Sequence, residues 1–473
     1  MLMLEDKCVG LENTEIFEGS LPGSRIYYFP IPENPGESVL KNRINLVKMA
    51  GFNGILLPFY KEGTPLFESE VAHRNHFRKI RPDLEKAPDI FDIIFHEASE
   101  NGLSVYAMVE PLVAGDNYLH LDENVPFFRR GHKLASMNRL KNLFPLGDNP
   151  GRMYLCINNV DTRRFVADLV VEISEAYPVS AVVLDIHDYP YESDVPDYTS
   201  CYCRYCRKQV EKELQLDLMT IPLDPEDPAY KRWKRWKEGR RLSFIQYVFS
   251  RMAKTRRRMP FLTIVPRDFT TVIASPDKNE ITPASWASEG IVTSLIPDYK
   301  DVESSKMVKR LEADLENIPD DSLLAPFFHL KESQELSAFL EPLGQLPLWG
   351  YFISLEEQIS ETMALKLREY PFHKDEVDSM NDIHTSILSL LDYLLHCGKG
   401  HFAGEGFLMN LRNDLEEKDK ISMDRMLEYL DDLRTVEQKL QSGDLDSVLM
   451  PEKALRHLKL VKKMLKAALL LSR

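Results

Sequence analysis

The sequence predicts a (β/α)8 barrel followed by a C-terminal helical region. Eight short apolar segments follow one another along the chain, and a stretch with helical spacing of its apolar residues separates each from the next. The strand segments are almost continuously apolar, which is typical of parallel strands buried on both faces. Eight such units in succession favour closure into a barrel, and an open doubly wound sheet is the alternative.

The first half of the barrel follows a polar leader over residues 1–23. "SRIYYFPI" at 24–31 is rich in aromatic and β-branched residues, and "SVLKNRINLVKMAGF" continues with helical spacing. The same strand and helix unit recurs with strands at 53–60, 103–111 and 179–190. The sequence therefore predicts four consecutive strands before the cysteine-rich segment.

The second half of the barrel repeats this pattern, and the chain then changes character. Four further apolar strands are expected at 260–268, 291–299, 322–330 and 346–354. Beyond them, segments such as "DIHTSILSLLDYLLHCGKG" have helical spacing and no strand follows. We expect the barrel over 24–372 and a helical region over 373–473, whose apolar end could form the interface of a homo-oligomer.

Composition and charge narrow the class of partner. The 473 residues carry a formal net charge of -15, which repels nucleic-acid phosphate and anionic membranes. No uncharged apolar run reaches the roughly 18 residues of a membrane span, and the start "MLMLEDKCVG" carries acids where a signal peptide needs bases. The sequence predicts a cytoplasmic protein with a small neutral or cationic substrate, no nucleic-acid partner and no membrane.

Three cysteines stand close together in "TSCYCRYCRKQVEKEL", at Cys201, Cys203 and Cys206. Six cysteines in this chain are too few for a disulfide scaffold, so a local cluster favours metal binding. Zinc prefers four thiolate or imidazole ligands, and Cys156, in the loop before the preceding helix, could supply the fourth. Three exposed thiols without a metal are the alternative, while a redox pair would need a thioredoxin-type fold.

The segment from "YLCINNVDTRRF" through "CYCRYCRKQVEKELQLDL" resembles the β-galactosidases of glycoside hydrolase family 42. The resemblance implies one structural zinc held by Cys156, Cys201, Cys203 and Cys206. Four thiolates leave no open position for a substrate, so this metal would hold a loop. Zinc-dependent hydrolysis would require an open position, with His187 or a water replacing Cys156.

Polar residues stand at the C-terminal ends of the otherwise apolar strands. In a barrel the active site lies at these strand ends. Carboxylates dominate, and two carboxyl groups are the minimum machinery for glycoside hydrolysis. The candidate catalytic residues are Asp185, Asp188, Glu110, Asp268 and Asp298. The candidate substrate-binding residues are His187, Tyr189, Arg267, Tyr299 and His329.

A second resemblance covers roughly residues 40–355. Segments such as "ENGLSVYAMVEP", "VSAVVLDIHDYPYES" and "VTSLIPDY" are similar to the glycosyl-hydrolase-like family 10 barrels. This resemblance implies that Asp185, with Asp188 behind it, marks the catalytic face. The family's DG pair is absent, because Ser180 and Ala181 stand there.

Two functional hypotheses follow. The first is a glycoside hydrolase that cleaves an O-glycosidic bond of a carbohydrate. The second is a non-catalytic barrel that binds a sugar or a protein. The absence of the family 42 glutamates favours it. His187-Asp188 stands in place of the Asn-Glu pair on strand four, and His329 stands where strand seven would carry the nucleophilic Glu. Asp185 could also merely accept loop hydrogen bonds, and Arg267-Asp268 could be an internal ion pair.

Overall fold

The structure is a computed structural model of the chain, and it describes part of the sequence at the level of individual residues. The described residues are 24–33, 35–75, 77–85, 90–116, 134–141, 152–187, 201–224, 226–255, 260–265, 286, 292, 294–300, 304–317, 324–330, 350–355, 359–368, 409–413, 429 and 433–435.

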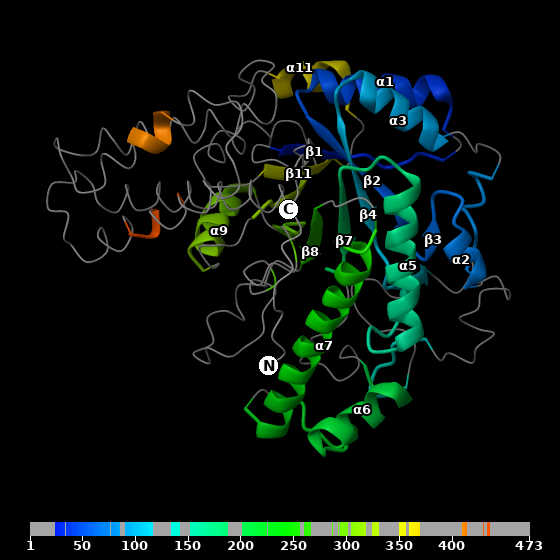
Figure 1. Cartoon of the computed structure of the whole chain (residues 1–473), viewed down its shortest axis with the longest axis vertical. Coiled ribbons are helices and arrows are strands. Elements are labelled where there is room, and N and C mark those ends of the chain that lie inside the picture. The colour runs from blue at the N-terminus through cyan, green and yellow to red at the C-terminus, as the bar shows by residue number, and fades with distance from the viewer. Residues whose placement is uncertain are drawn as a thin grey trace, which may run out of the picture. The chain divides into compact units, whose positions relative to one another are not determined.

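Eight parallel strands among the described residues form the barrel (Figure 1), in the spatial order β10-β11-β1-β2-β4-β7-β8-β9. Parallel bridges from Leu295 to Leu324 and from Asp298 to Phe327 join the two ends of this path, so the sheet is closed. The closure confirms the predicted (β/α)8 barrel and excludes the open sheet. The strands are β1 (Ser24–Tyr28), β2 (Gly54–Lys61), β4 (Ser104–Val109), β7 (Ala181–Asp185), β8 (Phe261–Val265), β9 (Ser294–Pro297), β10 (Phe327–Leu330) and β11 (Gly350–Leu355).

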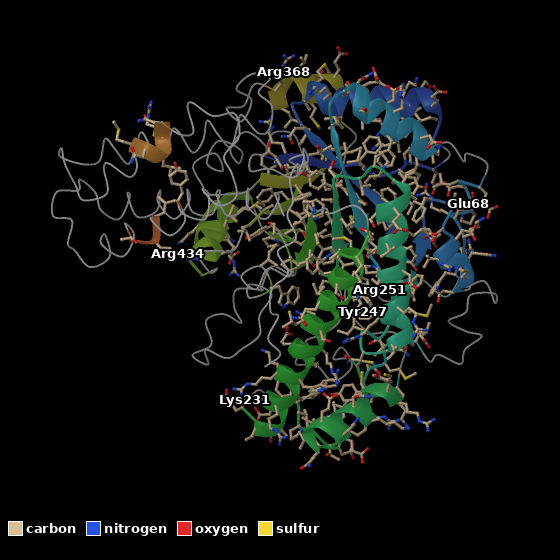
Figure 2. All side chains as sticks on the ribbon, viewed as in Figure 1. Glu68, Lys231, Tyr247, Arg251, Arg368 and Arg434 are labelled. Atoms are coloured by element: carbon tan, nitrogen blue, oxygen red, sulfur yellow. The ribbon has the colours of Figure 1, made fainter. Side chains whose placement is uncertain are left out.

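Helices cover the outside of the strands. Helices α1 and α3 lie side by side, as do α5 and α7 (Figure 1). Arg251 of α7, labelled in Figure 2, reaches Asp168 of α5 with an N···O distance of 2.6 Å. The described helices of the barrel unit are α1 (Glu37–Met49), α2 (Glu70–Arg74), α3 (Ile90–Glu100), α5 (Val160–Ala176), α6 (Arg204–Leu214), α7 (Pro228–Met252), α9 (Ser304–Asn317) and α11 (Glu361–Arg368).

Local sequence signals account for the helix boundaries around β7. Asn159 caps α5 by accepting the backbone N–H of Asp161, and Asp227 caps α7 with Pro228 at the first helical position. Strand β7 itself, AVVLD, is buried along its whole length. The strand predicted within 179–190 is therefore confirmed. A short apolar run that follows a capped helix is typical of a parallel strand buried on both faces.

Two buried clusters are found among the described residues of the barrel unit. The larger one is the barrel core, which joins the strands to α1, α3 and α5. The smaller one surrounds the four cysteines with side chains from α6, α7 and the segments beside them, among them Tyr202, Leu218, Ile221, Tyr230 and Trp233. An antiparallel pair of strands, β5 (Val113–Asp116) and β6 (Arg152–Tyr154), precedes this second core in the chain.

The chain divides into two compact units, one formed by residues 21–382 and the other by residues 1–20 together with 383–473. In the second unit, residues 409–413 and 433–435 are helical. The predicted boundary at residue 372 stays a prediction. Among the helices that the structure describes, none combines the length and the apolar character needed to cross a bilayer.

A tight contact at the barrel wall provides a stability test. A Cβ atom at Gly350 of β11 would lie 2.3 Å from the carbonyl oxygen of Ser24 on β1, whereas one at Gly36 would meet nothing within 4 Å. We expect Gly350→Ser to lower the free energy of unfolding by about 1–3 kcal/mol, because the backbone of β1 must shift. Gly36→Ser, which places a favourable N-cap residue before α1, should leave it unchanged or raise it slightly. Urea unfolding followed by circular dichroism measures both, and equal stabilities would contradict the packing described.

Candidate functional site

The C-terminal ends of the strands bring polar side chains to one end of the barrel. Seven of them, all among the described residues, are called the mouth cluster below: Tyr28, Lys61, Glu110, Asp185, His187, Asp298 and His329. Glu110 and Asp185 are neighbours in register, because they directly follow the paired residues Val109 of β4 and Leu184 of β7. Both residues are buried. Neighbouring strands lie about 4.8 Å apart, so the two carboxylates start from adjacent positions on the rim.

A continuous chain of contacts links Asp185 to His329. The ring Nδ1 of His187 lies 2.5 Å from Oδ1 of Asp185, and the His187 backbone N–H donates to the same oxygen at 3.2 Å. The other ring nitrogen of His187, Nε2, lies 3.1 Å from Oδ2 of Asp298. Nε2 of His329 lies 2.9 Å from Oδ1 of Asp298. Two imidazoles therefore share one carboxylate, and His187 stands between two carboxylates.

Asp298 is held as a buried anion. Burial alone would raise its pKa, but the close contact with His329 at 2.9 Å and the positive potentials of His187 and His329 outweigh it, so that the pKa lies below the ordinary value. The backbone N–H of Lys300 donates to Oδ1 at 3.0 Å and adds to the same effect. An anion with both oxygens engaged is suited to orienting its partners, not to donating a proton.

Glu110 follows β4, on the side of Asp185 away from β8. Its Oε2 accepts the backbone N–H of Glu62 at 2.8 Å, and its own backbone N–H donates to the carbonyl of Tyr60. The negative charge of Glu110 adds to burial in raising the pKa of the Tyr60 hydroxyl. Glu110 is thus fixed by the turn that follows β2.

Two members of the mouth cluster, Tyr28 and Lys61, are not among the candidates predicted from the sequence. Nζ of Lys61 donates to the hydroxyl of Tyr28 at 3.1 Å. Burial raises the pKa of Tyr28 against the opposing effect of Lys61, and the charges of Glu110 and Asp185 raise it further. The Tyr28 hydroxyl therefore lies within electrostatic reach of both carboxylates. Both residues end apolar strands, so the rule that selects Glu110 and Asp185 also applies to them.

Other predicted site residues lie elsewhere or outside the described part. Tyr299 is fully buried and its hydroxyl donates to Asp314 of α9 at 2.6 Å, away from the mouth cluster. In this structure its hydroxyl is engaged by α9, and its role in substrate binding stays a prediction. The candidates Asp188, Tyr189, Arg267 and Asp268 lie outside the described residues. The structure brings together the remaining candidates, Glu110, Asp185, His187, Asp298 and His329.

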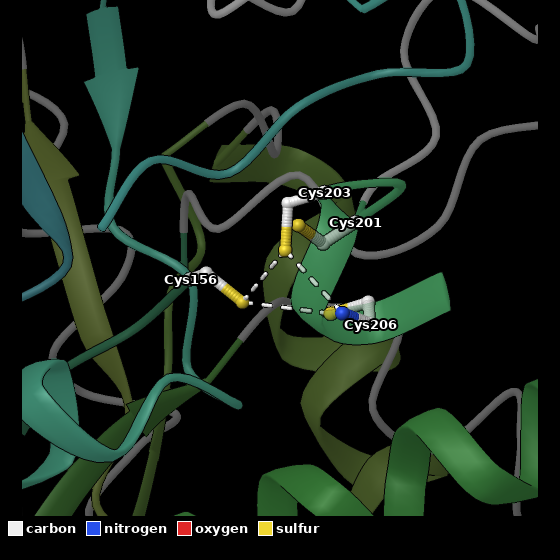
Figure 3. A group of neighbouring side chains, drawn as sticks. All are labelled: Cys156, Cys201, Cys203 and Cys206. Atoms are coloured by element: carbon white, nitrogen blue, oxygen red, sulfur yellow. Dashed lines mark hydrogen bonds between the residues drawn. The ribbon is translucent and has the colours of Figure 1, made fainter. Parts of the chain in front are cut away.

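The four cysteines Cys156, Cys201, Cys203 and Cys206 form a buried cluster (Figure 3). Their sulfur atoms all lie within 4.8 Å of one another, with Cys156 to Cys206 at 3.5 Å and Cys156 to Cys203 at 3.7 Å. These separations are far longer than the roughly 2.05 Å of a disulfide. A tetrahedron of sulfurs about 2.3 Å from a central zinc ion has edges of about 3.8 Å, so the donor set fits a tetrahedral metal.

Local structure explains how the cysteines meet. Cys156 follows β6, and its backbone N–H donates to the carbonyl of Leu134. Cys203 caps α6, with its Sγ accepting the backbone N–H of Cys206 at 3.5 Å. The side-chain amide of Asn158 donates to Sγ of Cys206 at 3.1 Å, a contact suited to a thiolate. The cluster can hold a metal ion, and all four coordination positions would come from the protein.

Fold and site together define a (β/α)8 barrel with an acidic and histidine-bearing mouth and a separate four-cysteine cluster. Residues 28–314 match the family described as glycosyl hydrolase-like 10, and the chain belongs to this family. No curated protein sequence matches the chain.

The chain is similar to solved structures at low sequence identity. The alpha-L-fucosidase isoenzyme 2 from Paenibacillus thiaminolyticus is 12% identical with a TM-score of 0.46, over 73% of this chain and 48% of that one, so the present chain spans about half its length. The catalytic domain of beta-amylase from Paenibacillus polymyxa is 10% identical with a TM-score of 0.49, over 74% and 99% of the two chains. The beta-galactosidase from the psychrophilic Marinomonas ef1 is 9% identical with a TM-score of 0.47, over 77% and 60%. Similarity at this level says nothing about the substrate of this chain.

The buried Asp298 predicts a specific acid response. Because the folded state lowers its pKa, the ionised form stabilises the fold above the ordinary value of 3.8, and this contribution is lost as the pH falls through the lowered value. Asp298→Asn should reduce the free energy of unfolding at pH 7 by about 1–3 kcal/mol and flatten its decline below about pH 4. Asp92→Asn, at an exposed position of α3, is the control. An unchanged acid response in urea unfolding of Asp298→Asn would contradict the assignment.

Proposed function

We propose that the protein is a glycoside hydrolase that cleaves an O-glycosidic bond, with Glu110 and Asp185 as its pair of catalytic carboxyl groups. The observation that carries the proposal is their placement: two buried carboxylates in matching register at the ends of neighbouring strands, on the face where barrel enzymes have their active sites. Membership of the glycosyl hydrolase-like 10 family is consistent with a carbohydrate as substrate.

The chemistry needs one carboxylic acid to protonate the leaving oxygen and one carboxylate to attack the anomeric carbon or activate water. Glu110 and Asp185 supply the two groups. Tyr28 and Lys61, joined at 3.1 Å, supply a hydroxyl and an ammonium near both, which suits hydrogen bonding to sugar hydroxyls. Asp298 is already engaged by two imidazoles and a backbone N–H, which favours a positioning role for it.

We further propose that the four cysteines hold one structural zinc ion. Zinc is the metal that best fits four thiolates in a tetrahedron, and a site closed by four protein ligands keeps no position for a substrate. When bound, the ion would stabilise the small core around Tyr202 and Trp233. Four unpaired buried thiols persist in a reducing compartment, which supports the expectation of a cytoplasmic protein.

The test of the enzymatic proposal is hydrolysis of a panel of aryl glycosides and oligosaccharides, followed by detection of released reducing ends. We expect turnover by the wild-type chain, and a reduction of kcat by at least about 100-fold in both Glu110→Gln and Asp185→Asn, because each removes an acid, base or nucleophile. Glu68→Gln is the matched control, since Glu68 is exposed at the edge of the barrel unit (Figure 2).

Three results are distinguishable in this test. Loss of turnover in both mouth variants and not in Glu68→Gln supports the proposal. Turnover that survives in Asp185→Asn would contradict the assignment of Asp185. Absence of turnover on every sugar, with sugar binding retained in calorimetry, would favour the alternative, a non-catalytic carbohydrate-binding barrel.

Metal analysis tests the cysteine cluster separately. We expect about one zinc ion per purified chain, and its loss in Cys206→Ser, with a midpoint of thermal unfolding lower by on the order of 5–10 °C because the small core loses its centre. Cys8→Ser removes a cysteine outside the cluster and should retain the metal. A wild-type chain that binds no zinc when refolded with an excess of it would refute the structural site.

A further inference from the structure

We propose that His187 is a positioning residue: an imidazolium, protonated on both ring nitrogens, that bridges the carboxylates of Asp185 and Asp298 and keeps Asp185 ionised. The inference rests on the proposed function, because it assigns the roles of the two carboxyl groups in that reaction. The protonation state of His187 can be measured whether or not the protein shows activity.

Each ring nitrogen of His187 lies beside a carboxylate. Nδ1 lies 2.5 Å from Asp185 and Nε2 lies 3.1 Å from Asp298. An ionised carboxylate only accepts hydrogen bonds, and a neutral imidazole has only one N–H to give. If both aspartates are ionised, both nitrogens of His187 must carry hydrogen. The alternative is a proton on one of the carboxyl groups.

The surroundings of Asp298 disfavour a proton on that carboxyl. Its Oδ1 receives the backbone N–H of Lys300 at 3.0 Å and lies 2.9 Å from Nε2 of His329, and its Oδ2 faces His187. An imidazole is ordinarily the stronger base, with a pKa of about 6.5 against about 3.9 for an aspartic acid, so a proton shared between them resides on the ring. Asp298 therefore stays an anion and is one of the two acceptors that the His187 ring bridges.

The contacts of Asp185 show which of its carboxylate oxygens His187 holds. Its Oδ1 receives two bonds from His187, one from the ring and one from the backbone N–H at 3.2 Å. Within the part of the chain that the structure describes, no hydrogen bond to Oδ2 is found. Oδ1 is thus held by His187, and the proposal assigns Oδ2 to the substrate.

The mouth cluster that includes His187 carries charges of both signs. Asp185, Asp298 and Glu110 are acidic, Lys61 is basic, and Tyr28 and His329 complete the set. Lys61 donates to the hydroxyl of Tyr28 at the end of β2. Among the described residues, the basic side chains in direct contact with Asp298 are those of His187 and His329. An imidazolium at His187 offsets the repulsion between the two aspartates that it joins.

The consequence is a division of labour in the proposed reaction. Glu110, as the acid, gives its proton to the leaving oxygen, which also keeps the electron pair of the broken C–O bond. In one route Asp185 Oδ2 bonds to the anomeric carbon; water then displaces Asp185 from that carbon and gives its proton to Glu110, which restores the acid. In the other route Asp185 Oδ2 takes a proton from the water whose oxygen bonds to the anomeric carbon; Asp185 then releases this proton to solvent, and Glu110 regains one from solvent. One water is consumed in either route. His187 takes no part in these transfers and holds Asp185 in place.

The direct test is ring-nitrogen NMR of the full-length chain labelled with 15N-histidine. The chain has 12 histidines, so the His187 signal is identified by its loss in His187→Gln, or in His187→Asn if the first variant fails to fold. His73→Gln, at an exposed position on α2, should remove a different signal and leave this one unchanged. We expect both ring nitrogens of His187 to carry hydrogen at pH 7, and Asp298→Asn to shift the loss of the second proton to lower pH by at least about one unit. A singly protonated His187 at pH 7 in the wild-type chain overturns the proposal.

A kinetic experiment tests the functional half. If the chain is a glycosidase, His187→Gln should lower kcat by at least about 10-fold with little change in KM, and should move the acidic limb of the pH profile upward by about one unit or more. A purely structural role would lower activity without moving that limb, and that result would overturn the positioning role. Failure to find any substrate would count against the proposed function, whereas the NMR measurement alone decides the protonation state of His187.

Discussion

The parallel seam between Asp298 and Phe327 is the contact on which the barrel and its mouth both depend. Asp298 pairs with Phe327 where the last gap in the sheet closes, and its carboxylate lies between His187 of the β7 end and His329 of β10. Closure therefore does more than bury apolar strands. It brings side chains that are far apart in the sequence to within hydrogen-bond distance, at the strand ends where barrel enzymes place their polar groups.

The four-cysteine cluster and the mouth cluster meet on the same segment of chain. Cys156 precedes α5, which leads into β7, and His187 follows β7, while Cys201 begins the next described segment. The strand that carries Asp185 is thus flanked in sequence by the elements that the cysteines join. A metal bound there would restrain both segments that flank β7. A structural metal would thus help to position Asp185, although the proposed chemistry is carried out by carboxylates.

Much of the fold could be predicted from the sequence, and the reasons are local. All eight predicted strands are present. Uninterrupted apolar runs between helices are typical of parallel strands buried on both faces, so the pattern of apolar residues is enough to identify them. The grouping of the four cysteines is predictable as well, since the close spacing of three of them limits the loop that joins them.

The site was predictable only in part. Tyr28 and Lys61 end their strands, but the predicted strands 24–31 and 53–60 place Tyr28 inside the first and Lys61 just beyond the second. Asp298 and Tyr299 are consecutive, so their side chains leave on opposite faces, and Tyr299 packs against α9. The bridge from His187 to Asp298 depends on the spatial order β7-β8-β9 of the strands, which no local pattern records.

Glu110 and Asp185 are expected to contact one substrate from neighbouring strands. The most direct measurement is the distance between their carboxyl groups in a crystal structure with a bound sugar or sugar analogue. We expect a separation of about 5–5.5 Å for a retaining enzyme or roughly 6.5–9.5 Å for an inverting one, with the sugar between them. A separation well beyond this range, or a sugar bound away from both, would contradict the pairing of these two carboxylates.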